Sequence, residues 1–138
     1  MDKPDYFFLS AKEEAAMKVL WASEKALSAT QIAEKIPNRS WSASSIQNIL
    51  RSLEKKNAIR VESIAKIGKS YGRFFVPTIS ANEYATMQFS RYYQDSKKDC
   101  FSMINSLLGN TNTKKEEAVE VLQALLKEYE TDKKSDQN

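Results

Sequence analysis

The sequence lacks several residue types on which many enzymes and secreted proteins depend. Of its 138 residues none is histidine, and Cys100 is the single cysteine. Without histidine, neither a Ser-His-Asp triad nor an imidazole zinc site can form, and no glycine-rich phosphate-binding motif is present. One cysteine cannot form an intrachain disulfide, which fits a reducing compartment. The composition therefore argues against an enzyme and against a bound metal or other cofactor.

Glycine, proline and long apolar runs are also scarce. Three glycines and three prolines predict few long loops and favour helices. No apolar run approaches the roughly 20 residues of a membrane span, and the apolar stretch at residues 6–9 is too short for a secretory signal. We therefore expect a cytoplasmic protein without membrane insertion.

Basic side chains are concentrated in the middle of the sequence. Residues 39–73 hold eight Lys or Arg and two Asp or Glu. A basic block within a folded segment is typical of a protein that binds a polyanion such as double-stranded DNA. Charge alone leaves an ordinary solvated surface as an equally good explanation.

Capping-box patterns mark the expected starts of several helices. In this pattern a Ser or Thr side chain caps the helix, and a Glu or Gln three residues later caps the backbone of that Ser or Thr. The pairs are Ser10–Glu13, Ser28–Gln31, Ser80–Glu83 and Thr113–Glu116. Together with apolar residues at helical spacing, they predict helices at residues 11–22, 29–36, 43–56, 81–94, 97–108 and 114–130.

The spacing of apolar residues changes after the third of these helices. Residues 59–62 alternate between apolar and charged side chains, as in a half-buried strand. Residues 65–72 contain two glycines suited to a turn, and residues 73–76 form the expected return strand, which Pro77 ends. Three helices followed by a β-hairpin are the element order of a winged helix-turn-helix.

The predicted fold class is therefore mainly α with a small β-hairpin, in which a winged helix-turn-helix is followed by C-terminal dimerisation helices. We expect a DNA-binding domain at residues 1–79, a helical dimerisation domain at 80–131 and a flexible tail at 132–138.

The helix predicted at residues 43–56 has the composition of a DNA-recognition helix. Its apolar face consists of Ile46, Ile49, Leu50 and Leu53, and the opposite face is polar and basic. Ser, Asn, Gln and Arg side chains can hydrogen-bond to base edges, and cations bind phosphates. An ordinary solvated helix face is the alternative. The residues expected to face bases are Ser44, Ser45, Gln47, Asn48 and Arg51, and those expected to face phosphates are Lys55, Lys69 and Arg73.

The C-terminal helices carry apolar stripes that a single short chain has little surface to cover. Packing against a second subunit would bury them, so we expect a homodimer; folding back onto the winged helix is the alternative. The expected dimer contacts are Tyr84, Leu107, Leu108, Val121, Leu122, Leu125 and Tyr129.

Several motifs occur in the order and spacing of a known family. They are Leu9-Ser10, Glu14, Met17, Leu20-Trp21, Trp41-Ser42, the stretch from Ile49 to Asn57, Phe75-Val76-Pro77 and Glu83-Tyr84. In these motifs the chain, from about Leu9 to Tyr129, resembles the penicillinase-repressor family of the BlaI/MecI type, which has copper-responsive relatives. The resemblance implies a repressor that dimerises through its C-terminal helices and binds a palindromic operator.

The resemblance also bears on how the protein is released from DNA. In the antibiotic-responsive branch a sensor protease cleaves between an Asn and a Phe that follow a Leu-Leu run. The corresponding bond here joins Asn110 and Thr111, so the Phe is absent. The copper branch uses paired Cys-x-Cys motifs, which the single Cys100 does not provide.

Two departures concern the recognition helix. A Lys-Thr pair of the family is Ser44-Ser45 here, and a Thr one turn later is Asn48. The Arg before the last Leu of the helix is Ser52, with Arg51 one residue earlier. We therefore expect an operator that differs from the usual one of the family.

Two other hypotheses remain open at this point. One is a regulator that holds a small effector between its C-terminal helices, in a pocket lined by Tyr84, Phe89, Tyr92 and Phe101. The other is a winged helix that contacts only proteins. This hypothesis does not explain why basic residues are concentrated in segment 39–73.

Overall fold

The computed structural model describes residues 6–92, 97–110 and 114–136. The chain forms two compact units, Met1–Arg91 and Tyr92–Asn138.

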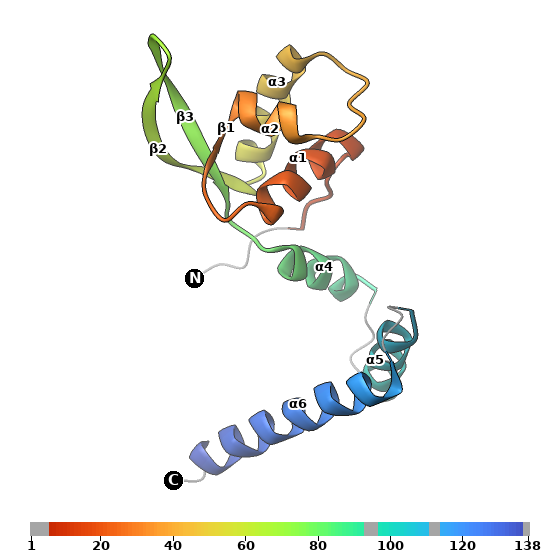
Figure 1. The fold of residues 1–138 in the computed structure, drawn as a ribbon. Coiled ribbons are helices and arrows are strands. Elements are labelled where there is room, and N and C mark those ends of the chain that lie inside the picture. The colour runs from red at the N-terminus through yellow and green to blue at the C-terminus, as the bar shows by residue number, and fades with distance from the viewer. Residues whose placement is uncertain (1–5, 93–96, 111–113, 137–138) are drawn as a thin grey trace. The chain divides into compact units, whose positions relative to one another are not determined.

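The described residues of the first unit form four α-helices, one short 3-10 helix and a small antiparallel sheet (Figure 1). The helices are α1 (Ala11–Ala22), α2 (Ala29–Lys35), the short 3-10 helix η1 (Ala43–Ser45), α3 (Ile46–Lys55) and α4 (Ala81–Ser90). The strands are β1 (Leu27–Ser28), β2 (Ile59–Ile67) and β3 (Ser70–Pro77), in the order β1-β3-β2. This arrangement confirms the predicted winged helix-turn-helix.

The β2-β3 hairpin is longer than the sequence predicted, and it extends beyond the three helices (Figure 1). Its strands pair from Ile59↔Pro77 to Ile67↔Ser70, so the turn consists only of Gly68 and Lys69. The prediction of a turn over 65–72 was wrong because the second glycine, Gly72, lies within β3. A Cβ at Gly72 would overlap Cδ1 of Ile67, so this glycine makes room for a side chain of the paired strand.

Strand β1 was not predicted, since two residues are too few to show an alternating pattern. Leu27 and Ser28 pair with Phe75 and Phe74 of β3, which joins the α1–α2 connection to the sheet.

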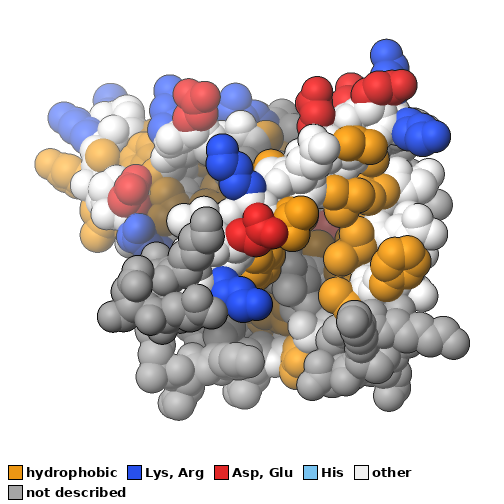
Figure 2. Space-filling view, turned by 90° about the horizontal axis from the view of Figure 1, so that it is seen from below, with side chains coloured by type: hydrophobic (Ala, Val, Ile, Leu, Met, Phe, Trp, Pro, Cys, Tyr) orange, Lys and Arg blue, Asp and Glu red, His pale blue; other side chains and the backbone are white. Residues whose placement is uncertain are grey.

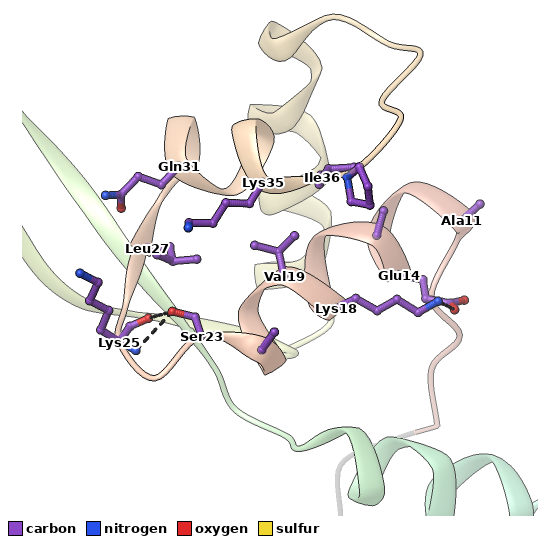
Figure 3. Close-up of a pocket in the computed structure, with 13 residues that line it drawn as sticks. Ala11, Glu14, Lys18, Val19, Ser23, Lys25, Leu27, Gln31, Lys35 and Ile36 are labelled. Atoms are coloured by element: carbon purple, nitrogen blue, oxygen red, sulfur yellow. Dashed lines mark hydrogen bonds and ion pairs between the residues drawn. The ribbon is translucent and has the colours of Figure 1, made fainter. Parts of the chain in front are cut away.

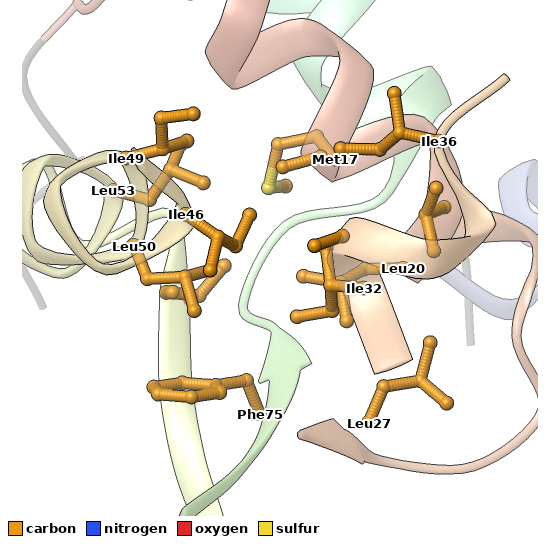
Figure 4. Packing of buried hydrophobic residues seen from close by; sticks show 14 of the residues in the cluster. Met17, Leu20, Leu27, Ile32, Ile36, Ile46, Ile49, Leu50, Leu53 and Phe75 are labelled. Carbon is orange, nitrogen blue, oxygen red and sulfur yellow. The ribbon is translucent and has the colours of Figure 1, made fainter. Parts of the chain in front are cut away.

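The core of the first unit lies where the three helices meet the sheet. Side chains of α3 face those of α1 and α2, and Phe75 of β3 packs beside them (Figure 4). The apolar face predicted for α3 is confirmed, because all four of its residues are buried. The buried apolar residues are Ala16, Met17, Val19, Leu20, Leu27, Ile32, Ala33, Ile36, Ile46, Ile49, Leu50, Leu53, Ala58, Ile59 and Phe75.

Local capping explains where the helices begin. The capping boxes at Ser10, Ser28 and Ser80 are all formed, with both hydrogen bonds present in each. The fourth expected cap, Thr113, lies outside the described residues. The helix predicted at 43–56 instead begins as η1 and continues as α3 without a side-chain cap.

Within the first unit, the segment that contains α4 packs against the N-terminal segment and α1. The backbone N–H of Leu9 donates to the Tyr84 hydroxyl (3.0 Å), and Nε1 of Trp21 donates to the carbonyl of Ile79 (2.8 Å). The Tyr84 ring also lies 5.8 Å from that of Phe7. The compact units therefore divide after Arg91, whereas the expected boundary followed residue 79.

The second unit contains α5 (Lys97–Asn110) and α6 (Lys115–Asp136). Helix α5 extends two residues past the expected stop at Leu108, and α6 extends to Asp136 through most of the expected flexible tail at 132–138. The residues of that tail up to Asp136 include no Gly or Pro that would end a helix. None of the helices in the described ranges is long and apolar enough to cross a membrane.

Candidate nucleic-acid interface

Helix α3 separates a buried face from a polar face. While its four apolar side chains enter the core, Gln47, Asn48, Arg51 and Lys55 are exposed. In η1, which precedes it, Ser44 is exposed and Ser45 is half-buried. The structure thus brings all six of these predicted contact residues onto one continuous segment, 44–55.

Hydrogen bonds join side chains of this segment to one another and to Ser42, which precedes it. Nη1 of Arg51 donates to Oδ1 of Asn48 at 3.3 Å, one helical turn away. The Ser42 hydroxyl lies 2.9 Å from that of Ser44 and 3.4 Å from that of Ser45. These amide, guanidinium and hydroxyl groups are the donors and acceptors that bind base edges and phosphates.

A buried carboxylate in α1 fixes the inner side of α3. Glu13 is 4% exposed, and its carboxylate accepts from the Ser52 hydroxyl (2.9 Å) and from Nζ of Lys56 (2.6 Å). Lys56 also donates to the carbonyl of Phe8 (2.7 Å). Ser52 therefore serves to position the helix, which its sequence position did not reveal.

The charge of Glu13 is stabilised in place. Burial by itself raises the pKa of this carboxyl, but the hydrogen bonds from Lys56, from the Ser10 backbone and from the hydroxyls of Ser52 and Ser10 outweigh it, so that the pKa lies below its ordinary value. An ionised Glu13 thus joins the start of α1 to the end of α3.

The end of α3 directs the chain into the hairpin. Asn57 has a φ of +61°, and the N–H of Ala58 donates to the carbonyl of Leu53 at 2.9 Å. This is the Schellman arrangement, which usually has Gly at the left-handed position. The Thr78 hydroxyl donates to the carbonyl of Asn57, so the residue after β3 also holds this turn.

The loop before α3 is held by Trp41. Nη1 of Arg39 donates to the Trp41 carbonyl (2.6 Å), and its guanidinium lies 5.3 Å from the centre of the indole ring. Nζ of Lys12 lies 6.0 Å from the same ring. No role was predicted for Arg39 from the sequence; the Trp41-Ser42 motif two residues later was the signal that could have revealed it.

The two cations predicted in the wing, which is the β2-β3 hairpin, differ in their surroundings. Lys69 lies in the two-residue turn and is exposed. Arg73 forms an ion pair with Glu54 of α3 (3.2 Å), and its guanidinium lies 5.1 Å from the Phe75 ring centre. Arg73 thus joins the wing to α3 in addition to any role toward phosphate.

Two exposed apolar side chains of the wing lie on the same side as Arg73. Ile64 is paired with Arg73 across the hairpin, and Tyr71 is two residues away along β3. Because side chains alternate along a strand, all three share one face. Ile64 is 66% exposed and Tyr71 75% exposed, so both are available to a ligand of the wing. Ile64 was not singled out from the sequence.

The residues expected at a dimer interface are distributed over both units. Leu107, Val121, Leu122, Leu125 and Tyr129 are exposed, and Leu108 is half-buried, all in α5 or α6. Tyr84 instead lies in the first unit, packed against Phe7 and Trp21.

The predicted cleavage bond lies at the edge of the described residues. Asn110 is the last residue of α5, and Thr111 lies outside the described residues. In the part of the chain that the structure describes, no three His, Cys, Asp or Glu side chains are grouped so that they could hold a metal ion.

Comparison with solved structures finds several regulators. The ferric uptake regulator Fur of Helicobacter pylori is 33% identical over 51% of this chain and 45% of its own, less than half of that protein, with a TM-score of 0.40. The transcriptional regulator PA3341 is 16% identical over 91% of this chain and 80% of its own (TM-score 0.42). MarR of Staphylococcus aureus, solved with salicylate and kanamycin, is 13% identical over 92% and 75% (TM-score 0.42). No curated protein matches.

Comparison with family models is more informative. The model described as penicillinase repressor matches residues 9–128, which is most of the chain. This match confirms the resemblance found in the sequence motifs, and it confirms the expectation of a transcriptional regulator and not an enzyme. The chain belongs to the penicillinase repressor family, and it is a winged-helix, DNA-binding regulator of transcription.

Proposed function

We propose that this protein represses transcription in the cytoplasm as a homodimer bound to a palindromic operator. The observation that carries the proposal is the exposed polar face of α3, which is positioned by a buried network on its inner side. Membership of the penicillinase repressor family supports the same assignment.

Within this proposal the residues of segment 44–55 have distinct roles. Asn48 and Gln47 offer amide groups suited to adenine, and Arg51 offers a guanidinium suited to guanine. Ser44 and Ser45 have short side chains, which allow the backbone to come close to the groove. Phosphates would be bound by Lys55 and Lys69. Arg73 would bind phosphate as well once its ion pair with Glu54 is broken.

The proposed dimer is supported by the apolar surface of the second unit. Val121, Leu122 and Leu125 are each more than two-fifths exposed, and Tyr129 is 70% exposed. Apolar side chains also lie at the surface on the face of the molecule shown in Figure 2. A second copy of α5 and α6 could cover such a stripe, and two-fold symmetric proteins bind two-fold symmetric DNA sites.

Titration of DNA duplexes with the full chain tests the proposal. Fragments from upstream of the protein's own gene would be titrated at about 50 and 200 mM salt, with the Asn48→Ala variant in parallel. We expect sequence-selective binding that weakens by about a thousandfold or more between these salt concentrations if six or more phosphates are contacted. Asn48→Ala should cost about 1–3 kcal/mol on the selected fragment.

The matched control is Asn82→Ala, which removes an exposed Asn from α4 outside segment 44–55. It should bind as the unchanged protein does. If no duplex from the gene region or from a random-sequence pool is preferred over bulk DNA, the protein is not a sequence-specific repressor, and the hypothesis of a module that contacts only proteins gains support.

A further inference from the structure

An open groove runs between α1 and α2 in the first unit (Figure 3). Its volume is about 790 Å³. Val19 of α1, Leu27 of β1 and Ile36 at the end of α2 lie between the two helices and form an apolar floor. Since all three side chains are buried in the core, the floor is held rigidly by residues that also stabilise the fold.

Three of the six residues that α1 contributes to the groove are alanines. Ala11, Ala15 and Ala22 line the groove on one face of the helix, with Lys18 between the last two. From Ala11 to Ala22 this side of the groove is about 16 Å long, or three helical turns. Small residues at this spacing let the backbone of another helix come close.

The rim of the groove is positively charged. Lys18, Lys25 and Lys35 line it, against a single carboxylate, Glu14, which is paired with Lys18 at 3.0 Å. Among the described residues Lys25 and Lys35 have no ion pair, so two cations are available to an acidic ligand.

The groove is separate from the DNA-binding surface. None of the residues proposed to contact bases or phosphates lines it. The residues that line the groove are therefore different from those proposed to bind DNA.

The shape of the groove favours a peptide over a small molecule. Small-molecule sites usually enclose most of their ligand, whereas this groove is partly open to solvent. A groove between two helices with a charged rim is a form that receives an amphipathic helix.

From these observations we propose that the groove between α1 and α2 binds an acidic amphipathic helix of a partner protein. Its apolar stripe packs on Ala15, Ala22 and Pro37, which are half-buried or exposed, and its carboxylates pair with Lys25 and Lys35. This interaction is independent of the DNA-binding function proposed above.

Nuclear magnetic resonance on the isotopically labelled full chain tests the proposal. The probe is a synthetic helical peptide of about 14 residues, with Leu at every third or fourth position and Glu on the flanks. We expect amide shifts confined to α1, α2 and residues 23–27. Charge reversal by Lys35→Glu or Lys25→Glu should weaken binding about threefold to tenfold each. Both lysines are exposed, so both variants should fold.

Two controls separate this site from general charge attraction. Arg60→Glu reverses an exposed cation on β2, outside the groove, and should leave peptide binding unchanged. A peptide with Lys in place of Glu should not bind.

Three results would overturn the proposal. The first is peptide shifts that fall outside the groove, and the second is equal weakening by Lys35→Glu and Arg60→Glu. The third is groove shifts from a fatty-acid probe such as octanoate but none from the acidic peptide, which would assign a small-molecule site.

Discussion

At the scale of single residues, Glu13 has two tasks. It completes the capping box of α1, and it receives hydrogen bonds from Ser52 of α3 and from Lys56, the residue that follows α3. Both tasks depend on an ionised carboxylate, because protonation would remove acceptor capacity and the attraction of Lys56. The position of α3 is therefore linked to the charge of a residue that does not face DNA.

Glu13→Gln should lower the free energy of unfolding at neutral pH by about 1–3 kcal/mol. Because the pKa of Glu13 is depressed in the folded protein, its contribution is present above the unfolded pKa and is lost as pH falls through the folded pKa. The stability gap between variant and unchanged protein should therefore close at acidic pH. Urea unfolding at several pH values measures it.

Glu14→Gln is the matched control for that substitution. Glu14 is exposed and forms only a surface ion pair with Lys18, so the change should stay within about 0.5 kcal/mol. Equal effects of the two substitutions would show that the buried network does not stabilise the fold.

In the wing, cationic and apolar side chains should act on DNA binding in different ways. Lys69→Ala should weaken binding to all sequences and reduce the slope of log K against log salt concentration by about 1. Tyr71→Ala should weaken binding with that slope unchanged, because no counterion is released at an uncharged side chain. Duplex titrations over a salt series measure both effects. A reduced slope for Tyr71→Ala would contradict the prediction, because it would show that removing this uncharged side chain also removes phosphate contacts.

At the scale of elements, the turn at Asn57 sets the direction in which the hairpin leaves α3. A residue with positive φ is needed there, and Asn57 takes the position that Gly usually has in a Schellman turn. Asn tolerates this conformation better than residues with an ordinary Cβ do.

Asn57→Ala should lower the free energy of unfolding by about 1 kcal/mol, and Asn57→Gly should leave it unchanged or raise it. Denaturant unfolding of the two variants measures the difference, and each serves as the control for the other since both remove the same side chain. An alanine variant as stable as the glycine variant would contradict the role given to backbone strain.

At the scale of the whole molecule, the second unit contains the long helix α6, whose apolar stripe is exposed. The stripe consists of Val121, Leu122, Leu125 and Tyr129. In the proposed dimer this stripe is the contact between copies.

Leu122→Lys should shift the protein from dimer toward monomer, because it places a charge in the proposed contact. Sedimentation equilibrium measures the shift. Gln123→Lys, about 100° around α6 from Leu122 and outside the apolar stripe, is the control and should leave the association unchanged. Operator binding should weaken only for Leu122→Lys. A monomeric unchanged protein, or equal effects of the two variants, would refute the dimer contact.

Much of the architecture follows from local sequence signals. The starts of α1, α2 and α4 were predicted from capping residues, and the buried face of α3 from its apolar spacing, because these signals act within one or two turns of a helix. The exposed positions of Asn48 and Arg51 follow from the same spacing.

Other features depend on segments that are distant in the sequence. Ser52 bonds to Glu13, 39 residues away, and Arg73 bonds to Glu54, 19 residues away; neither partner can be found from spacing within one helix. The packing of α4 on the first unit, the two-residue strand β1 and the α1–α2 groove likewise exist only once the chain has folded. The sequence by itself thus determined where α1, α2 and α4 begin and which face of α3 is polar, since backbone capping and apolar periodicity are local. Only the tertiary structure decided which polar residues hold that helix in place, since those contacts join side chains that no local pattern relates.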